Sequence, residues 1–188
     1  MNKKQLFASL VGVLVSVSAF AETGAFAFKN TSAPKTKVLG VDGLGIGGAN
    51  YLIGVLVKDP STGNFTDVGL LKNGAAYVPA VPLTGANAGL FTGGVITVPF
   101  LNSGGTATVK VVAWDVTTGA SYNAATTRGT SVAFDIVGLG SGAGSGGNVL
   151  PPDMSLVFPG LQLQVIPEPS TYALAALGLG GLLLFRRK

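Results

Sequence analysis

The chain contains no cysteine and no histidine among its 188 residues. Without cysteine, no disulfide can staple the fold and no thiolate can act as a nucleophile or a ligand. Without histidine, the chain lacks the side chain that most often serves as a general acid or base and as a zinc ligand. Any enzyme built on this chain would have to work with carboxylates alone. We therefore expect no enzymatic activity, no cofactor and no metal site.

Charged residues are also scarce, at 11% of the chain, and the formal net charge of +4 is misleading. Five of the 12 Lys and Arg residues lie at the chain ends: Lys3, Lys4, Arg186, Arg187 and Lys188. Between residues 22 and 169, seven scattered cations face eight anions, which is a net charge of −1. This region therefore lacks the basic stripe of a nucleic-acid-binding protein.

The N-terminus has the three parts of a Sec signal peptide. Lys3 and Lys4 precede an apolar stretch that begins at Leu6, and Ala19-Phe20-Ala21 has the small-x-small form that signal peptidase cleaves. We expect residues 1–21 to be removed after Ala21, with residues 25–27 as a weaker second site. The Sec translocon and signal peptidase are thus expected partners.

The C-terminus carries a second three-part signal. A Pro-Glu-Pro segment at residues 166–171 precedes an uncharged apolar run, residues 172–185, and the basic stop Arg186-Arg187-Lys188. The prolines exclude helix interior and central strand, so they hold a short extended segment outside the bilayer. The 14 apolar residues would span only about 21 Å as a helix, against about 30 Å of hydrocarbon. The terminal cations nevertheless can snorkel, and they follow the positive-inside rule.

This tail resembles the PEP-CTERM sorting signal of Gram-negative bacteria, which a membrane-embedded cysteine protease, the exosortase, recognises and removes. The resemblance implies a transient transmembrane helix in the inner membrane, followed by release to the cell surface or extracellular matrix. An ordinary tail anchor is the alternative. The sorting motif that the resemblance implies consists of Pro167, Glu168, Pro169, Ser170 and Thr171.

Between the two signals, residues 22–165 show short strand patterns separated by glycine-rich turns. Strands are predicted at residues 25–29, 51–57, 65–71, 76–81, 95–98, 106–114, 132–137 and 161–165. Asn73-Gly74 predicts a type I′ hairpin turn. Residues 120–127 are either a short helix or, given their Thr and Asn content, a loop. We predict an all-β fold, a single antiparallel β-sandwich, flanked by the signal-peptide helix and the C-terminal transmembrane helix.

Alternation along residues 106–114 predicts which side chains face the core. Ala107, Val109, Val111 and Ala113 share one face, whereas Thr108 and Lys110 lie on the other. The predicted core residues are Ile53, Val109, Val111 and Phe134.

A second resemblance covers most of this region. The order of residues 51–56, 94–99, 109–115 and 131–134 is similar to that in small PEP-CTERM proteins that occur as paralogues in verrucomicrobial genomes. No activity is known for that group. This resemblance therefore implies only fold and export.

Two glycine-rich segments, residues 43–48 and 142–147, fit the pattern G-x-G-x-x-G. Neither lies between a strand and a helix, so turns or linkers are the better interpretation. Asp59, Ser61, Asn64 and Asp67 gather oxygen donors that leave a Ca²⁺ site open. They lack the charge density and bidentate acid of an EF-hand loop, so solvated turn residues are favoured.

Asp115 and Asp135 could be neighbours across paired strands, as the two carboxyl groups of a glycosidase must be. A local hydrogen-bonding role for Asp115 at its strand end is favoured. Trp114 is the only tryptophan and the candidate ligand contact. Facing outward with Lys110, it could bind sugar or a neighbouring subunit. A bulge would instead turn it into the core, which is the commoner position of a lone tryptophan.

Three classes of function remain. The favoured one is a non-enzymatic surface or matrix protein, processed by an exosortase and associated with exopolysaccharide or with further copies of itself. The second is a carbohydrate-binding module that uses Trp114 and nearby polar loops. The third, a carboxylate-dependent glycosidase, is disfavoured because residues 22–165 hold only seven Asp or Glu. A solvent-facing aromatic platform would distinguish the first two.

Overall fold

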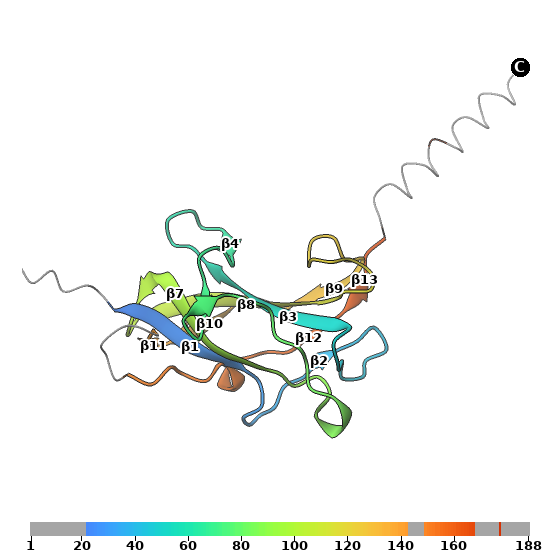
Figure 1. Cartoon of the computed structure of the whole chain (residues 1–188), viewed down its shortest axis with the longest axis horizontal. Helices are drawn as coiled ribbons and strands as arrows, with labels where there is room; N and C mark the ends of the chain where they lie inside the picture. The colour runs from blue at the N-terminus through green and yellow to red at the C-terminus, as the bar shows by residue number, and fades with distance from the viewer. Residues whose placement is uncertain (1–21, 143–148, 168–176, 178–188) are drawn as a thin grey trace, which may run out of the picture.

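The computed structural model describes residues 22–142, residues 149–167 and Leu177. Within these residues the regular structure is almost entirely β-strand (Figure 1), so the all-β prediction is confirmed. The same part of the chain holds no helix that is long and apolar enough to span a membrane. The predicted signal peptide, residues 143–147 of the second glycine-rich segment, the sorting signal beyond Pro167 and the basic stop lie outside the described residues, as does the predicted transmembrane run except Leu177.

Five strands form the first sheet, in the order β11-β1-β7-β5-β6, and all neighbours are antiparallel. Their bounds are Thr23–Lys29 (β1), Leu71–Lys72 (β5), Ala75–Ala76 (β6), Thr92–Asn102 (β7) and Gly140–Ser141 (β11). The predicted Asn-Gly hairpin joins β5 to β6. Asn73 and Gly74 have φ angles of 49° and 80°, which is the left-handed conformation that a type I′ turn requires. The predicted strand at residues 76–81 was wrong beyond Ala76, because β6 ends there and only an isolated bridge of Ala80 with Ile53 follows.

Six strands form the second sheet, in the order β13-β9-β8-β3-β4, with β10 also paired to β8. Their bounds are Tyr51–Lys58 (β3), Phe65–Thr66 (β4), Thr106–Asp115 (β8), Thr127–Thr130 (β9), Phe134–Val137 (β10) and Gln164–Val165 (β13). Both β9 and β10 pair with the edge of β8 that β3 leaves free. The buried Ser131 lies between them, and its Oγ accepts a hydrogen bond from the backbone N–H of Val111 at 3.0 Å.

The remaining regular structure is small. A two-stranded parallel sheet joins β2 to β12, and Ala27 and Asp153 form an isolated parallel bridge, so the predicted antiparallel pairing has short exceptions. Two single-turn 3₁₀ helices complete the described elements. Their bounds, with those of the parallel strands, are Val38–Leu39 (β2), Gly85–Asn87 (η1), Met154–Leu156 (η2) and Leu161–Gln162 (β12).

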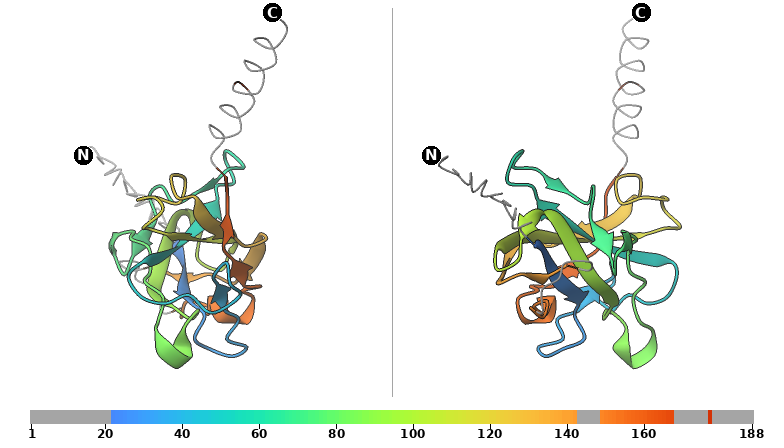
Figure 2. Two further views of the ribbon diagram at one scale, coloured as in Figure 1. Left: turned by 90° about the vertical axis from the view of Figure 1, so that its right-hand side faces the viewer. Right: turned by 60° about the vertical axis from the view of Figure 1, so that its left-hand side comes forward.

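The two large sheets share one hydrophobic core, and end-on views show the strands surrounding a common interior (Figure 2). The predicted inward face of β8 is confirmed, because its four alternating residues are fully buried. Phe26, Phe28, Ile96 and Val98 meet that face from β1 and β7. Each large apolar side chain buried in this way contributes about 1.5–3 kcal/mol. Of the other predicted core residues, Ile53 is fully buried, whereas Phe134 is half-buried and packs against the cluster.

Two predicted strands are each divided between different sheets, and in this respect the sequence-based assignment was wrong. Residues 65–71 form β4 in the second sheet and the start of β5 in the first. The chain crosses over at Asp67–Leu70, where Leu70 N–H donates to Asp67 O and Gly69 has a φ angle of 79°. Residues 161–165 pair in parallel with β2 and then antiparallel with β9, and the buried Leu163 lies at the change of partner.

The described chain ends against the second sheet. After β13, the backbone N–H of Ile166 donates to Thr126 O at 2.7 Å, and Pro167 follows directly. Pro167, the first residue of the predicted sorting motif, is therefore one residue beyond this hydrogen bond.

Candidate functional site

The outer face of the second sheet carries the candidate site. Because side chains alternate along a strand, the buried face of β8 places Val112 and Trp114 on the outside. In the antiparallel register of β3 and β8, Gly54 lies opposite Val112, and Leu52 lies opposite Trp114. Trp114 and Val112 form a second, smaller apolar cluster with Ala125.

Gly54 keeps the centre of this face open. A Cβ atom placed on Gly54 would lie 3.1 Å from Val112 Cγ2, 3.3 Å from Tyr77 Oη and 3.5 Å from Trp114 Cζ3. A side chain here would therefore fill the space between these groups. A glycine within a strand is typical of sites where another group approaches the backbone closely.

Trp114 faces outward but is not exposed. The pairing of β3 with β8 continues without a break from Tyr51–Asp115 to Val57–Val109, so no bulge turns Trp114 inward. Its exposed fraction is nevertheless only 6%, because the segment 116–126 folds over it. The Tyr122 ring meets the indole edge-on, at a centroid distance of 6.3 Å. The indole Nε1 is buried and has no hydrogen-bond partner in the part of the chain that the structure describes.

The segment 116–126, here called the 120s arm, is fixed in place by Arg128. The Arg128 Nη1 donates to the backbone oxygens of Tyr122 and Asn123 at 2.8 and 2.7 Å. The guanidinium also lies over the Tyr122 ring, 5.2 Å from its centroid. At the base of the arm, Thr127 N–H donates to Thr118 Oγ1. The arm is therefore held by polar contacts at both ends.

A second arm, residues 59–70, projects from the other side of the same face and is here called the 60s arm. Asp59 forms its first turn, where its Oδ1 accepts from Ser61 N–H and Oγ at 2.8 and 2.6 Å. These hydrogen bonds lower the pKa of Asp59. Farther along the arm, Lys110 Nζ lies 4.4 Å from the centroid of the Phe65 ring.

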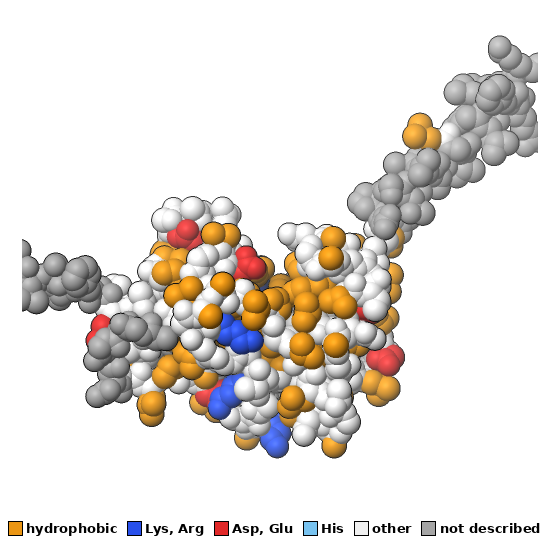
Figure 3. All heavy atoms as spheres, viewed as in Figure 1, with side chains coloured by type: hydrophobic (Ala, Val, Ile, Leu, Met, Phe, Trp, Pro, Cys, Tyr) orange, Lys and Arg blue, Asp and Glu red, His pale blue; other side chains and the backbone are white. Residues whose placement is uncertain are grey.

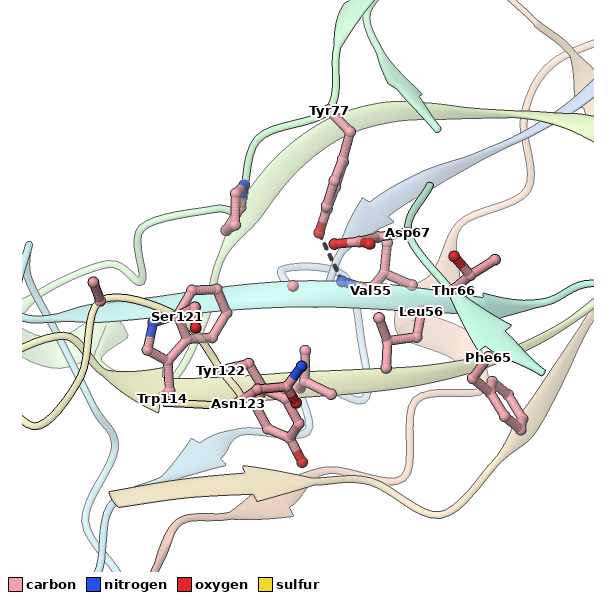
Figure 4. Close-up of a pocket in the computed structure, with 14 residues that line it drawn as sticks. Val55, Leu56, Phe65, Thr66, Asp67, Tyr77, Trp114, Ser121, Tyr122 and Asn123 are labelled. Carbon is pink, nitrogen blue, oxygen red and sulfur yellow. Dashed lines mark hydrogen bonds between the residues drawn. The ribbon is translucent and has the colours of Figure 1, made fainter. Parts of the chain in front are cut away.

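A groove of about 440 Å³ lies between the two arms, and it is visible as the hollow between two projections in the space-filling view (Figure 3). Gly54, Val112 and Trp114 form its floor. Figure 4 shows Phe65, Asp67 and Tyr77 on one side and the tip of the 120s arm on the other.

Tyr77 closes a gap in the edge of β3. Its hydroxyl oxygen accepts a hydrogen bond from Val55 N–H at 2.7 Å. Val55 lies between the Ile53–Ala80 bridge and the Val57–Thr66 pair, where no strand covers the edge. Burial raises the pKa of Tyr77, and the negative charge of Asp67 adds to this shift. The phenol therefore stays protonated at any physiological pH.

The glycosidase pair that the sequence left as a disfavoured alternative is not formed by Asp115 and Asp135. Asp135 pairs with Thr108, whereas Asp115 lies seven residues farther along β8, opposite Tyr51. At about 3.3 Å per residue the two are about 23 Å apart, beyond the roughly 5–9.5 Å that glycosidase carboxyl groups require. Asp115 Oδ1 instead accepts from Thr117 N–H and Oγ1, which is the predicted local role at the strand end. Asp135 Oδ1 accepts from Thr108 Oγ1.

The structure also locates the first glycine-rich segment and the residues that were considered as Ca²⁺ ligands. The first glycine-rich segment is a turn between β2 and β3, as predicted, and a Cβ on Gly45 would lie 2.3 Å from Ala88 O. The residues considered as Ca²⁺ ligands have different roles. Asp59 accepts a hydrogen bond within its own turn, whereas Asp67 lines the groove. Among the described residues, no three acidic side chains gather where they could hold a metal ion.

Sequence reasoning did not identify the groove. Trp114 was selected, but Gly54, Tyr77 and Asn123 were not, and Asp67 was considered only as a calcium ligand. One usable signal was the single glycine inside the apolar run of β3.

The chain therefore combines an all-β domain with a C-terminal tail that has the form of a sorting signal. Residues 165–188 match the PEP-CTERM protein-sorting motif. The chain is therefore an exported protein that carries the sorting signal of exosortase substrates, as its tail predicted. No curated protein and no solved structure matches the chain.

Proposed function

We propose that this chain is a non-catalytic component of the bacterial cell surface or extracellular matrix, which an exosortase releases from the inner membrane. The observation that carries the proposal is the PEP-CTERM protein-sorting motif at residues 165–188. After release, the β domain associates with exopolysaccharide or with further copies of itself. The Sec signal at residues 1–21 delivers it across the membrane.

Two observations support a role without catalysis. The chain has no histidine or cysteine, which removes imidazole and thiolate chemistry. The carboxyl groups that sequence alone offered for glycoside hydrolysis lie at opposite ends of β8. Each of them is engaged by a threonine hydroxyl beside it.

The sorting role is tested by replacing Pro167-Glu168-Pro169 with three alanines in the full chain, expressed in the producing bacterium. Without the prolines, helix can extend out of the apolar run and remove the extended recognition segment. We expect the parent to leave the membrane fraction, with a mature C-terminus upstream of the apolar run by mass spectrometry. The triple variant should stay membrane-bound and uncleaved.

The matched control is Pro60→Ala, which changes an exposed proline in the 60s arm and should be released like the parent. Equal release of the triple variant and the parent would contradict the sorting role. Hydrolysis of the producer's exopolysaccharide by the released protein would contradict the non-catalytic role.

A further inference from the structure

We propose that the groove between the 60s and 120s arms binds a neutral stretch of a glycan chain. This inference rests on the proposed function only in placing the released domain among extracellular polysaccharides. The site itself is argued from its lining: aromatic walls, free hydrogen-bonding groups, a single charge and a fixed shape.

The aromatic side chains provide apolar surface of the kind that the C–H faces of sugar rings contact. Phe65, Tyr77 and Tyr122 are half-buried on the two walls, and the edge of Trp114 reaches the floor beside Gly54. Binding pockets typically combine such apolar surface with a few polar groups that fix the orientation of the ligand. Because Gly54 has no side chain, the rings border an open floor rather than a filled core.

Two exposed polar side chains on opposite walls are available to a ligand. Asp67 and Asn123 line the groove, and neither side chain makes a hydrogen bond to another described residue. A carboxylate accepts hydrogen bonds, whereas an amide both donates and accepts. Sugar hydroxyl groups also do both, so a glycan chain can satisfy the two walls together.

The charge of the lining selects against acidic sugars. Asp67 is its one charged residue. Neither of the cations beside the wall rings belongs to the lining. Lys110 lies over the Phe65 ring, and Arg128 lies over the Tyr122 ring and bonds the backbone of its own arm. A uronic acid would meet the Asp67 carboxylate with no cation in the lining to pair it, and like charges at an interface cost affinity. A neutral hexose chain carries no such cost.

The groove is already formed without a ligand. Arg128 and Thr118 hold the 120s arm, and the Asp59 turn holds the start of the 60s arm. Binding therefore requires little ordering of loops, which would otherwise reduce the affinity.

The same geometry argues against an added peptide strand. Strand addition needs unpaired backbone groups along a sheet edge. The edge of β3 at this groove has Val55 N–H already bonded to the Tyr77 hydroxyl. A glycan needs no such edge, because it binds through side chains.

The single tryptophan makes the site directly measurable, since Trp114 lines the groove and no other tryptophan contributes fluorescence. The full chain, purified in detergent, would be titrated with cellohexaose and laminarihexaose as neutral probes, hexagalacturonate as the acidic probe, and a proline-rich decapeptide. We expect a saturable change in Trp114 emission with a neutral probe and at least ten-fold weaker binding of hexagalacturonate.

Variants assign the response to the groove. Asp67→Ala and Asn123→Ala each remove an exposed hydrogen-bonding group and should weaken binding about ten-fold, the loss of one hydrogen bond to a ligand. Gly54→Val fills the floor and should abolish the response. Asp135→Ala, an exposed carboxylate outside the groove, should bind like the parent. Far-UV circular dichroism establishes that each variant is folded.

Three results would overturn the proposal: no saturable response to either neutral hexamer, preferential binding of hexagalacturonate or the decapeptide, or unchanged binding after both Asp67→Ala and Asn123→Ala. None of these affects the release assay, which tests the sorting tail in cells. A failed release assay with a positive titration would in turn reject the proposed sorting and leave the groove established.

Discussion

At the scale of single residues, the informative positions are buried polar side chains that no sequence pattern marks. Asn30 is fully buried, and its side chain makes three hydrogen bonds to backbone groups. Its Oδ1 accepts from Phe91 N–H at 2.6 Å, and its Nδ2 donates to Thr36 O and Gly89 O. Such a role depends on partners about 60 residues away, which no local pattern reveals.

Asp153 has a similar role at the start of η2. Its carboxylate accepts from Ser32 Oγ at 2.6 Å and from Ser155 N–H at 2.9 Å, and it forms an ion pair with Lys29 at 3.1 Å. Burial alone would raise its pKa, but the hydrogen bonds from Ser32 and Ser155 and the Lys29 ammonium together lower the pKa to about 2.

The lowered pKa predicts how stability depends on pH. Because the pKa of Asp153 is lower in the folded state than the usual value of 3.8, the ionised carboxylate stabilises the fold above pH 4. This contribution, about 1–2 kcal/mol for a partly exposed group, is lost as the pH falls toward 2. We expect Asp153→Asn to lower the free energy of unfolding at pH 7 and to flatten its fall between pH 4 and 2, as measured by urea denaturation.

Asp135→Asn serves as the control, because Asp135 is exposed and its carboxylate bonds Thr108 rather than the partners of Asp153. If the free energy of unfolding falls equally with pH in the parent and in Asp153→Asn, the ionised Asp153 carboxylate does not stabilise the fold.

At the scale of secondary-structure elements, two of the three longest strands were predicted almost in full, whereas only residues 95–98 of β7 were. The apolar run of β3 and the alternation of β8 each specify a strand by themselves, and both were predicted within one residue of their ends. The hairpin turn at Asn73-Gly74 was equally clear, since few dipeptides tolerate two successive positive φ angles.

The elements that sequence reasoning missed are defined by their partners. Strand β9 contains Gly129, where a Cβ would lie 2.4 Å from Gln162 O, so its glycine reflects the close passage of another segment. Strand β2 has only two residues and exists through its pairing with β12. Residues 65–71 look continuous in sequence, but nothing local shows that their two ends belong to different sheets. The groove was missed for the same reason, because its walls come from separate segments.

The hairpin of β5 and β6 gives an element-scale prediction with two graded variants. Asn73 adopts a φ angle of 49°, and its Oδ1 also accepts from Val95 N–H at 2.9 Å. Asn73→Gly keeps the backbone conformation accessible but loses this bond, at a cost of about 0.5–1.5 kcal/mol. Asn73→Ala loses the bond and also strains the turn, which adds about 1 kcal/mol.

Thermal or urea unfolding of the two variants should therefore place Asn73→Gly between the parent and Asn73→Ala. If the alanine variant is as stable as the glycine variant, the turn does not depend on its left-handed conformation.

At the scale of the whole molecule, the two large sheets share one core. Their inward faces form a single cluster of buried residues, and the segment 65–72 passes directly from one sheet to the other. Neither sheet can bury its apolar face alone. The groove lies outside this core, on the outer face of the second sheet.

We therefore expect one unfolding transition for the whole domain. Trp114 fluorescence reports only the outer face of the second sheet, whereas far-UV circular dichroism reports both sheets. The two signals should give coincident midpoints in urea, as a two-state domain requires. A fluorescence transition at lower urea concentration would mean that the 120s arm opens independently of the core.

The hydrogen bond from Ile166 to Thr126 also sets a tether length. In the sequence, residues 167–171 separate this hydrogen bond from the apolar run that begins at Tyr172. Five residues can reach at most about 17 Å. If the apolar run spans the inner membrane, as proposed, the domain lies close to the membrane surface before release, with Thr126 of the 120s arm beside the tether. An exosortase would then have to reach its recognition segment in the short gap between the domain and the membrane surface. Insertions between Ile166 and Pro167 would lengthen this gap.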